Sequence, residues 1–132
     1  MLKQLAMAAA AMLMLSATAA PAAQNNGYVP KRTILQQTDA PDSKYTVILV
    51  VTEIAANMLA ARHTHPGVEI SYVLAGECDF DIEGIGVKHL KAGDSFRLES
   101  GVRHSVKNGN ATTKILAVYT IPKGAEMATP AP

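Results

Sequence analysis

Two histidines separated by one residue, His63 and His65, are the residues of this sequence best suited to bind a metal ion. In a β-strand, residues i and i+2 point to the same face with their backbones roughly 6.5–7 Å apart. Two imidazoles placed in this way can converge on one ion at about 2.0–2.2 Å each. A turn at Pro66-Gly67 follows, and Glu69 opens the next apolar stretch. A strand that begins there can bring a carboxylate beside the two rings.

A third histidine, His104, shares one face of its predicted strand with Val102 and Val106. For its ring to reach the same point from the far side, the sheet must be closed or nearly closed. Three neutral imidazoles and one carboxylate suit Mn, Fe, Co, Ni, Cu or Zn. Because imidazole must be neutral to coordinate a metal, we expect occupancy to fall as the pH drops below about 6.

The order and spacing of these residues resemble the two sequence motifs of small single-domain cupins. The first motif is Gly, five residues, His-x-His, three or four residues, Glu, six residues and Gly. Its counterparts here are Asn57, His63, His65, Glu69 and Gly76. The second motif is Gly, five residues, Pro-x-Gly, two residues, His, three residues and Asn. Its counterparts here are Gly93, Glu99, Gly101, His104 and Asn108.

Two motif positions depart from the family pattern, with Asn57 in place of a Gly and Glu99 in place of a Pro. Asn is among the few residues besides Gly that tolerate positive φ. Glu99 does not need the fixed φ of Pro if Gly101 makes the turn. These departures concern the shape of loops and leave all four ligand positions filled.

The resemblance implies an all-β fold, a single-domain cupin β-barrel built as a double-sheet jelly roll. It also implies one divalent transition metal ion held by His63, His65, Glu69 and His104. Cupins with this ligand set include dioxygenases, decarboxylases, isomerases and lyases. We therefore expect a small metal-dependent enzyme acting on a small organic molecule. In such an enzyme, Glu69 could leave the metal and act catalytically by taking a proton.

Two alternatives to an enzyme remain open at this point. A tetrahedral Zn with all four ligands bound would be closed and structural. The link between Gly76 and Gly93 is short and leaves no insertion that could act as a lid. This feature slightly favours a non-catalytic module that binds a metal or a small ligand.

Short segments rich in β-branched residues, separated by Gly, Pro, Asn and Asp, recur along the chain and predict a sandwich or barrel. The strands are predicted over residues 31–38, 45–52, 59–65, 69–75, 77–83, 87–91, 95–98, 102–107 and 113–121. The second of these reads as a strand buried on both faces. We expect a flexible leader with a first short strand over 24–43, the barrel over 44–122 and a flexible tail over 123–132.

The strand predicted over 69–75 has a second face opposite Glu69, which is formed by Ile70, Tyr72 and Leu74. These side chains could pack against a second sheet or a partner subunit. Cupins similar to this one are often dimers, so the resemblance implies a homodimer.

The composition bounds the protein to one ordinary domain of 132 residues. A formal net charge of +1 and the lack of a basic run argue against a nucleic-acid partner. The single cysteine, Cys78, excludes an intrachain disulfide and is expected to be a small core residue. His89 matches no ligand position and is expected at the surface.

Residues 1–23 have the layout of a secretory signal peptide: Lys3 near the start, an apolar run from Leu5 to Leu15, and then small residues. A membrane span needs about 20 strongly apolar residues. We therefore expect cleavage, no stable membrane anchor and a periplasmic or secreted protein. A chain exported unfolded must acquire its metal outside the cytoplasm. Intrinsic affinity then favours Cu or Zn, with Mn, Fe or Ni next.

Overall fold

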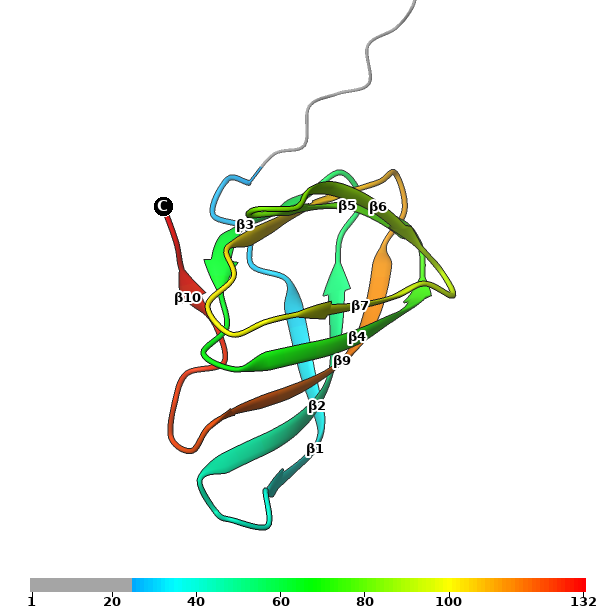
Figure 1. Ribbon diagram of the computed structural model, residues 1–132. Coiled ribbons are helices and arrows are strands. Elements are labelled where there is room, and N and C mark those ends of the chain that lie inside the picture. The colour runs from blue at the N-terminus through cyan, green and yellow to red at the C-terminus, as the bar shows by residue number, and fades with distance from the viewer. Residues whose placement is uncertain (1–24) are drawn as a thin grey trace, which may run out of the picture.

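A computed structural model describes residues 25–132, which form ten β-strands and no helix (Figure 1). The strands are β1 (Lys31–Asp39), β2 (Tyr45–Ile54), β3 (Leu59–Thr64), β4 (Val68–Ala75), β5 (Glu77–Ile82), β6 (Gly86–Lys91), β7 (Ser95–Leu98), β8 (His104–Asn108), β9 (Thr113–Pro122) and β10 (Thr129–Pro130). The predicted signal peptide over 1–23 lies outside the described residues. Within the described range, no helix is long and apolar enough to cross a bilayer.

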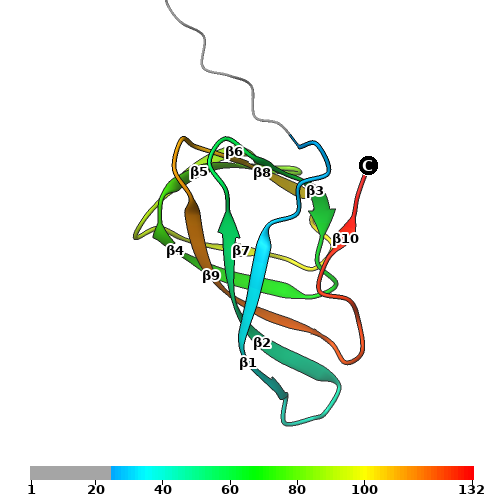
Figure 2. The ribbon, with the colours of Figure 1, turned by 180° about the vertical axis from the view of Figure 1, so that it is seen from behind.

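The strands form two five-stranded antiparallel sheets, in the orders β1-β2-β9-β4-β7 and β10-β3-β8-β5-β6. The front and back views show the two sheets as separate layers (Figures 1 and 2). The predicted all-β, double-sheet jelly roll is therefore confirmed. Among residues 25–132 no strand pairing joins one sheet to the other, so the architecture is a β-sandwich rather than a continuously bonded barrel.

Period-two burial explains why these segments are strands. In β5 the residues Cys78, Phe80 and Ile82 are buried, while the intervening acidic residues face outward, as the alternation predicts. β2 differs from the prediction of a strand buried on both faces. Its inward residues, including Ile48 and Val50, are buried, but its outward residues are only half-buried.

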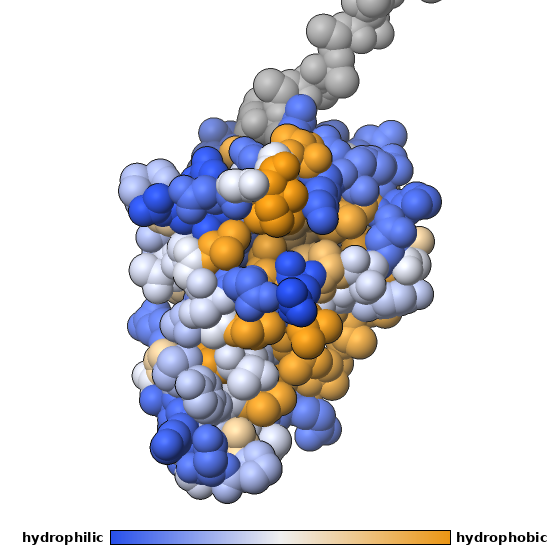
Figure 3. All heavy atoms as spheres, viewed as in Figure 1, coloured by the Kyte–Doolittle hydropathy of each residue, from blue (hydrophilic) through white to orange (hydrophobic). Residues whose placement is uncertain are grey.

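The core lies between the sheets and includes Ile54, Val73, Phe80, Val106 and Ile115. Several large apolar side chains nevertheless stay exposed. Figure 3 shows apolar side chains gathered in a band on the face seen in Figure 1, between hydrophilic margins. Among the exposed ones are the three outward residues of β4 that the sequence singles out, Ile70, Tyr72 and Leu74.

The C-terminal segment, expected as a flexible tail, differs from that expectation. Thr129 and Pro130 form β10 and pair with Thr64 and His63 of β3. The amide of Ala131 donates to a β3 carbonyl at 3.1 Å. The segment has no apolar alternation, and it is attached by backbone hydrogen bonds to β3 and by the packing of Met127 against the core.

The leader before β1 is also attached to the fold. The Asn25 side chain donates to the Leu59 carbonyl at 2.8 Å. The Tyr28 ring packs against the core, and its hydroxyl accepts the amide of Ala55 at 2.8 Å. Both ends of the described chain therefore lie against β3 or its neighbours, close to the histidine pair.

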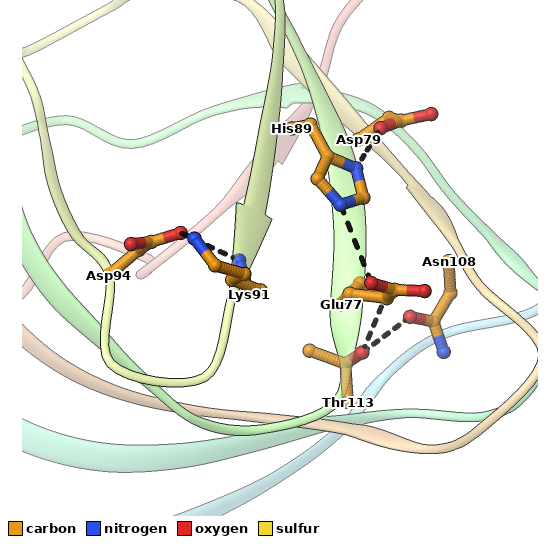
Figure 4. Close-up of polar contacts among 7 residues, drawn as sticks. All are labelled: Glu77, Asp79, His89, Lys91, Asp94, Asn108 and Thr113. Atoms are coloured by element: carbon orange, nitrogen blue, oxygen red, sulfur yellow. Dashed lines mark hydrogen bonds and ion pairs between the residues drawn. The ribbon is translucent and has the colours of Figure 1, made fainter.

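One buried side chain, Asn108, connects the end of its own strand β8 to the end of β2 and the start of β9 by hydrogen bonds. Its amide nitrogen donates to the carbonyls of Ile54, Ala55 and Ala111 at 2.8, 2.9 and 2.9 Å. Its amide oxygen accepts the hydroxyl of Thr113 at 2.6 Å (Figure 4). Asn108 is the last residue of the second motif, and the structure gives it a bridging role in the fold.

The turns use the predicted residues. Asn57, which takes the place of a motif glycine, has a φ of +59°. Gly101 has a φ of +76°, the left-handed conformation that glycine adopts without strain. Asn57 and Gly101 thus shape the loops before β3 and β8, which carry the histidines.

Candidate metal centre

The structure brings His63, His65 and His104 together, with ligand atoms that all lie within 4.8 Å of one another. His63 of β3 is the direct register partner of His104 of β8. Strand pairing therefore places these two rings side by side, with centroids 4.2 Å apart. His65 follows β3, and its ring centroid lies 5.0 Å from that of His63. Of the four predicted ligands, the structure therefore brings the three histidines into one group, and Glu69 is not a member of that group.

Each of the three imidazoles is oriented by a hydrogen bond from Nδ1 to a backbone carbonyl. The acceptors for His63, His65 and His104 are the carbonyls of Ala61, Met127 and Val102 at 2.7, 2.6 and 3.1 Å. Because the proton is held on Nδ1, the lone pair of Nε2 is free and Nε2 is the ligand atom. One of the three acceptors, Met127, belongs to the C-terminal segment, so that segment helps to build the site.

Glu69, the predicted fourth ligand, is 4% exposed and lies against His65. Its Oε2 is 3.1 Å from His65 Nε2, and its Oε1 accepts the Ser71 hydroxyl at 2.6 Å. Since His65 Nδ1 already faces the Met127 carbonyl, the ring has an acceptor oxygen on each side. The Nε2 atom of His65 and the Oε2 atom of Glu69 are therefore placed where both could contact one metal ion.

The donor set fits a divalent transition metal. Nitrogen and oxygen ligands about 2.0–2.2 Å from one ion are roughly 3 Å apart when they meet it near a right angle. The separation between His65 Nε2 and Glu69 Oε2 matches that spacing. The three-histidine group itself could hold a metal ion without Glu69.

Burial sets the protonation of the site. Desolvation, and then the neighbouring His104, lower the pKa of His63 to about 4. Desolvation also lowers the pKa of His104. Burial alone would raise the pKa of Glu69, but its hydrogen bond and Coulomb attraction to His65, together with the Ser71 bond, bring it below its usual value. At neutral pH His63 and His104 are neutral and Glu69 is ionised, as metal binding requires.

These pKa shifts change the expected pH dependence of metal binding. The lowered pKa values of His63 and His104 mean that protons compete for these two Nε2 atoms only at lower pH, so the ion should stay bound below the pH of about 6 expected for ordinary imidazole and be lost toward about pH 4, where His63 takes up a proton. Metal content measured after equilibration across this range checks the prediction. Loss of the ion already at about pH 6, the value for ordinary imidazole, would contradict it.

A cavity of about 30 Å³ adjoins the three histidines. Its wall also includes Arg32, Thr52, Phe80 and Tyr119. A space of this size holds about one or two water molecules, so the site leaves room for a small ligand beside the metal ligands.

The sequence alone did not identify Tyr119 as a residue of the site. Its ring lies 4.8 Å from that of His65, and the residue is 3% exposed. Burial, followed by the charge of Glu69, raises the pKa of Tyr119, so its hydroxyl stays protonated and can donate a hydrogen bond. The signal available in the sequence was a tyrosine, with its polar hydroxyl group, at an inward position of the strand that became β9.

Two residues that the sequence assigns no metal role lie apart from the three-histidine group. His89 is exposed, and its ring lies between Asp79 at 2.8 Å and Glu77 at 3.5 Å (Figure 4). The hydrogen bond to Asp79 is the main cause that raises the pKa of His89. Cys78 is buried, and burial raises the pKa of its thiol to about 12, as suits a core residue rather than a reactive one.

Fold and site together define a double-sheet jelly-roll protein with a three-histidine centre between its sheets. The family described as the cupin domain matches residues 50–119, more than half of the chain. The chain therefore belongs to the cupin family, and the resemblance seen in the sequence is confirmed. No curated protein matches the sequence.

Solved structures share the fold. An uncharacterized conserved protein with a double-stranded β-helix domain from Klebsiella pneumoniae is 26% identical, with a TM-score of 0.61 over 82% of this chain and 89% of that one. A DMSP lyase from Ruegeria pomeroyi is 20% identical, with a TM-score of 0.64 over 77% of this chain. An oxalate decarboxylase from Lactobacillus farciminis, in a formate complex, is 19% identical, with a TM-score of 0.61 over 76% of this chain. This chain covers 51% of the lyase and 31% of the decarboxylase.

Proposed function

We propose that this cupin is a small metal-dependent enzyme of the dioxygenase or decarboxylase/lyase type, acting on a small organic molecule. One observation carries the proposal. Three imidazoles, each with Nδ1 hydrogen-bonded to a backbone carbonyl, lie together and line one cavity that an ionised carboxylate also lines. The same fold carries lyase and decarboxylase activity in the DMSP lyase and the oxalate decarboxylase, which makes such chemistry compatible with this scaffold.

In this proposal His63, His65, Glu69 and His104 hold the ion. A bound divalent transition metal would supply a Lewis acid and, for redox-active metals, an electron-transfer centre. Glu69 is ionised and lies at the cavity, so it can accept a proton from a substrate. Tyr119 keeps its proton and lines the same cavity, so it can donate a hydrogen bond to a substrate oxygen.

The alternative function is a non-catalytic module that binds a metal or a small ligand. The small volume beside the histidines, about 30 Å³, is the observation that favours it. The enzyme and a metal-binding module require the same metal ligands, but only the enzyme requires Glu69 to take a proton.

Replacing Glu69 with glutamine tests the choice between these functions. Metal-loaded wild-type protein would first be screened for oxygen consumption and for product formation from phenols and small carboxylic acids. For an enzyme, Glu69→Gln should lower turnover about 100-fold or more while most of the metal stays bound. The exposed acid Glu77 provides the matched control, since Glu77→Gln should leave turnover unchanged.

One outcome would contradict the enzyme proposal, and another would contradict only the role of Glu69. If wild-type protein turns over none of the compounds and Glu69→Gln changes only affinity, the binding module is supported. If Glu69→Gln retains full turnover, Glu69 is not the proton acceptor.

We also propose that the chain is exported and that its native metal is Cu or Zn, with Mn, Fe or Ni next. The layout of residues 1–23 supports export. Metal uptake outside the cytoplasm would follow intrinsic affinity, which is highest for Cu and high for Zn. Metal analysis belongs on protein purified from its exported compartment, where dominant Mn or Fe would contradict the assignment.

A homodimer is the proposed assembly. Ile70 of β4 is 57% exposed and pairs with Val118 of β9, and Tyr72 pairs with Leu116 in the next row. These rows form an outward apolar face on the β1-β2-β9-β4-β7 sheet. Covering that face with a second copy would remove apolar surface from water.

A further inference from the structure

The four arginines of this chain fall into two pairs with different surroundings. Arg97 and Arg103 are exposed and form ion pairs with Glu99 at 2.8 Å and with Glu83 at 3.1 Å. Within residues 25–132, neither Arg32 nor Arg62 forms an ion pair with a carboxylate. Arginine is always charged at neutral pH, so these two guanidinium groups keep a positive charge that no acidic residue of the described chain balances.

Both unpaired arginines also carry a buried donor without an acceptor. The Nε atoms of Arg32 and Arg62 are buried, and neither has a hydrogen-bond partner. Leaving a buried donor unsatisfied is costly, more so for a charged group. Such groups are rare in folded proteins, and each one calls for an explanation. A ligand that supplies acceptor oxygens would satisfy both.

The two arginines line the same cavity, next to the metal centre. A cavity of about 220 Å³ is walled by Arg32, Arg62, His63 and apolar residues that include Pro30 and Pro130. Arg32 and His63 also form part of the wall of the smaller cavity at the three histidines. The larger space therefore adjoins the metal centre across these two shared residues.

The elements that carry the arginines explain why they meet. Arg32 lies on β1 opposite Thr52 of β2, and Thr52 lines the smaller cavity. Arg62 directly precedes His63 on β3, and its carbonyl accepts the amide of Ala131. The leader, β3 and the C-terminal segment thus line the larger cavity. Neither Arg32 nor Arg62 occupies a position that the two cupin motifs specify.

We propose that Arg32 and Arg62 bind the carboxylate of a small organic acid and position the rest of that molecule at the metal centre. This inference rests on the proposed function and deepens it by naming the substrate class. A guanidinium group binds a carboxylate through two parallel hydrogen bonds, which suits two arginines whose buried Nε donors have no acceptor. Pro30, Pro130 and the neighbouring apolar residues supply the surface for a short hydrocarbon body.

Binding of simple acids to the full chain tests the inference. Propionate, succinate and benzoate would each be compared with the corresponding neutral amide by calorimetry. We expect at least one acid to bind about 10-fold or more tightly than its amide. Arg62→Gln should weaken that binding about 10-fold. Arg62→Lys keeps the charge but cannot donate two parallel hydrogen bonds, and it should weaken binding less. Arg97→Gln is the matched control and should change the affinity less than about 2-fold.

Each sample also needs a metal analysis and a repeat after metal removal, because a carboxylate could bind the ion directly. Dependence on Arg62 that persists without metal supports the inference. Equal binding of every acid and its amide, or equal effects of Arg62→Gln and Arg97→Gln, would overturn it. These results are separate from the test of the proposed function, because turnover that depends on Glu69 can persist when anion binding does not depend on Arg62.

Discussion

Replacing His104 with alanine is expected to lower metal affinity at least about 100-fold, which corresponds to roughly 2.7 kcal/mol of binding free energy. His104 is 2% exposed and stands directly opposite His63 across β3 and β8. Its ring is stacked parallel to Phe80, with an interplanar angle of 9°, and is held by the Val102 carbonyl. The substitution therefore removes a ligand that the fold positions in advance.

Chelator competition followed by metal analysis measures this loss. His89→Ala is the matched control, because His89 is exposed and paired with Asp79 rather than with the histidine group. Circular dichroism would show that the variant is folded, and His104→Gln, which keeps more of the side-chain volume, provides a second test. Wild-type affinity in both His104 variants would refute the site.

Replacing Asn108 with alanine is expected to lower the free energy of unfolding by about 3 kcal/mol. The side chain is 4% exposed and makes four hydrogen bonds. Its removal leaves the buried carbonyl of Ile54 and the hydroxyl of Thr113 without this partner. The end of β2 and the start of β9 would then lose the group that connects them to β8.

Urea unfolding of the full chain at fixed metal content measures this effect. Asn110→Ala is the control, because Asn110 is exposed and lies two residues further along, in the loop that follows β8. We expect the control to change stability by less than about 0.5 kcal/mol. A similar small effect for Asn108→Ala would show that the hydrogen bonds at the strand ends do not stabilise the fold.

The fold and the core of the site were predictable because their signals are local. Alternation in residues 77–83 predicts a strand, and β5 occupies almost the same range. The His-x-His pair predicts two rings on one face, and the structure places His63, His65 and His104 together. Spacing along the chain was sufficient here because strand geometry fixes which side chains share a face.

The remaining parts of the site depend on contacts between distant segments. Met127, whose carbonyl orients His65, lies in a segment that has no apolar alternation and was expected to be a tail. Arg32 precedes the first motif, and nothing in its local sequence relates it to His63. Tyr119 is an inward residue of β9, a position at which a sequence predicts burial but not the neighbouring ring. Only the three-dimensional arrangement reveals these partners.

X-ray absorption spectroscopy on purified, metal-containing protein tests the central claim most directly, because it reports the ligands of the ion itself. We predict one ion per chain, bound by three imidazole nitrogens and at least one oxygen, with the imidazole signal reduced in His104→Ala. Substoichiometric metal, or an ion whose spectrum shows no imidazole ligands, would contradict the account.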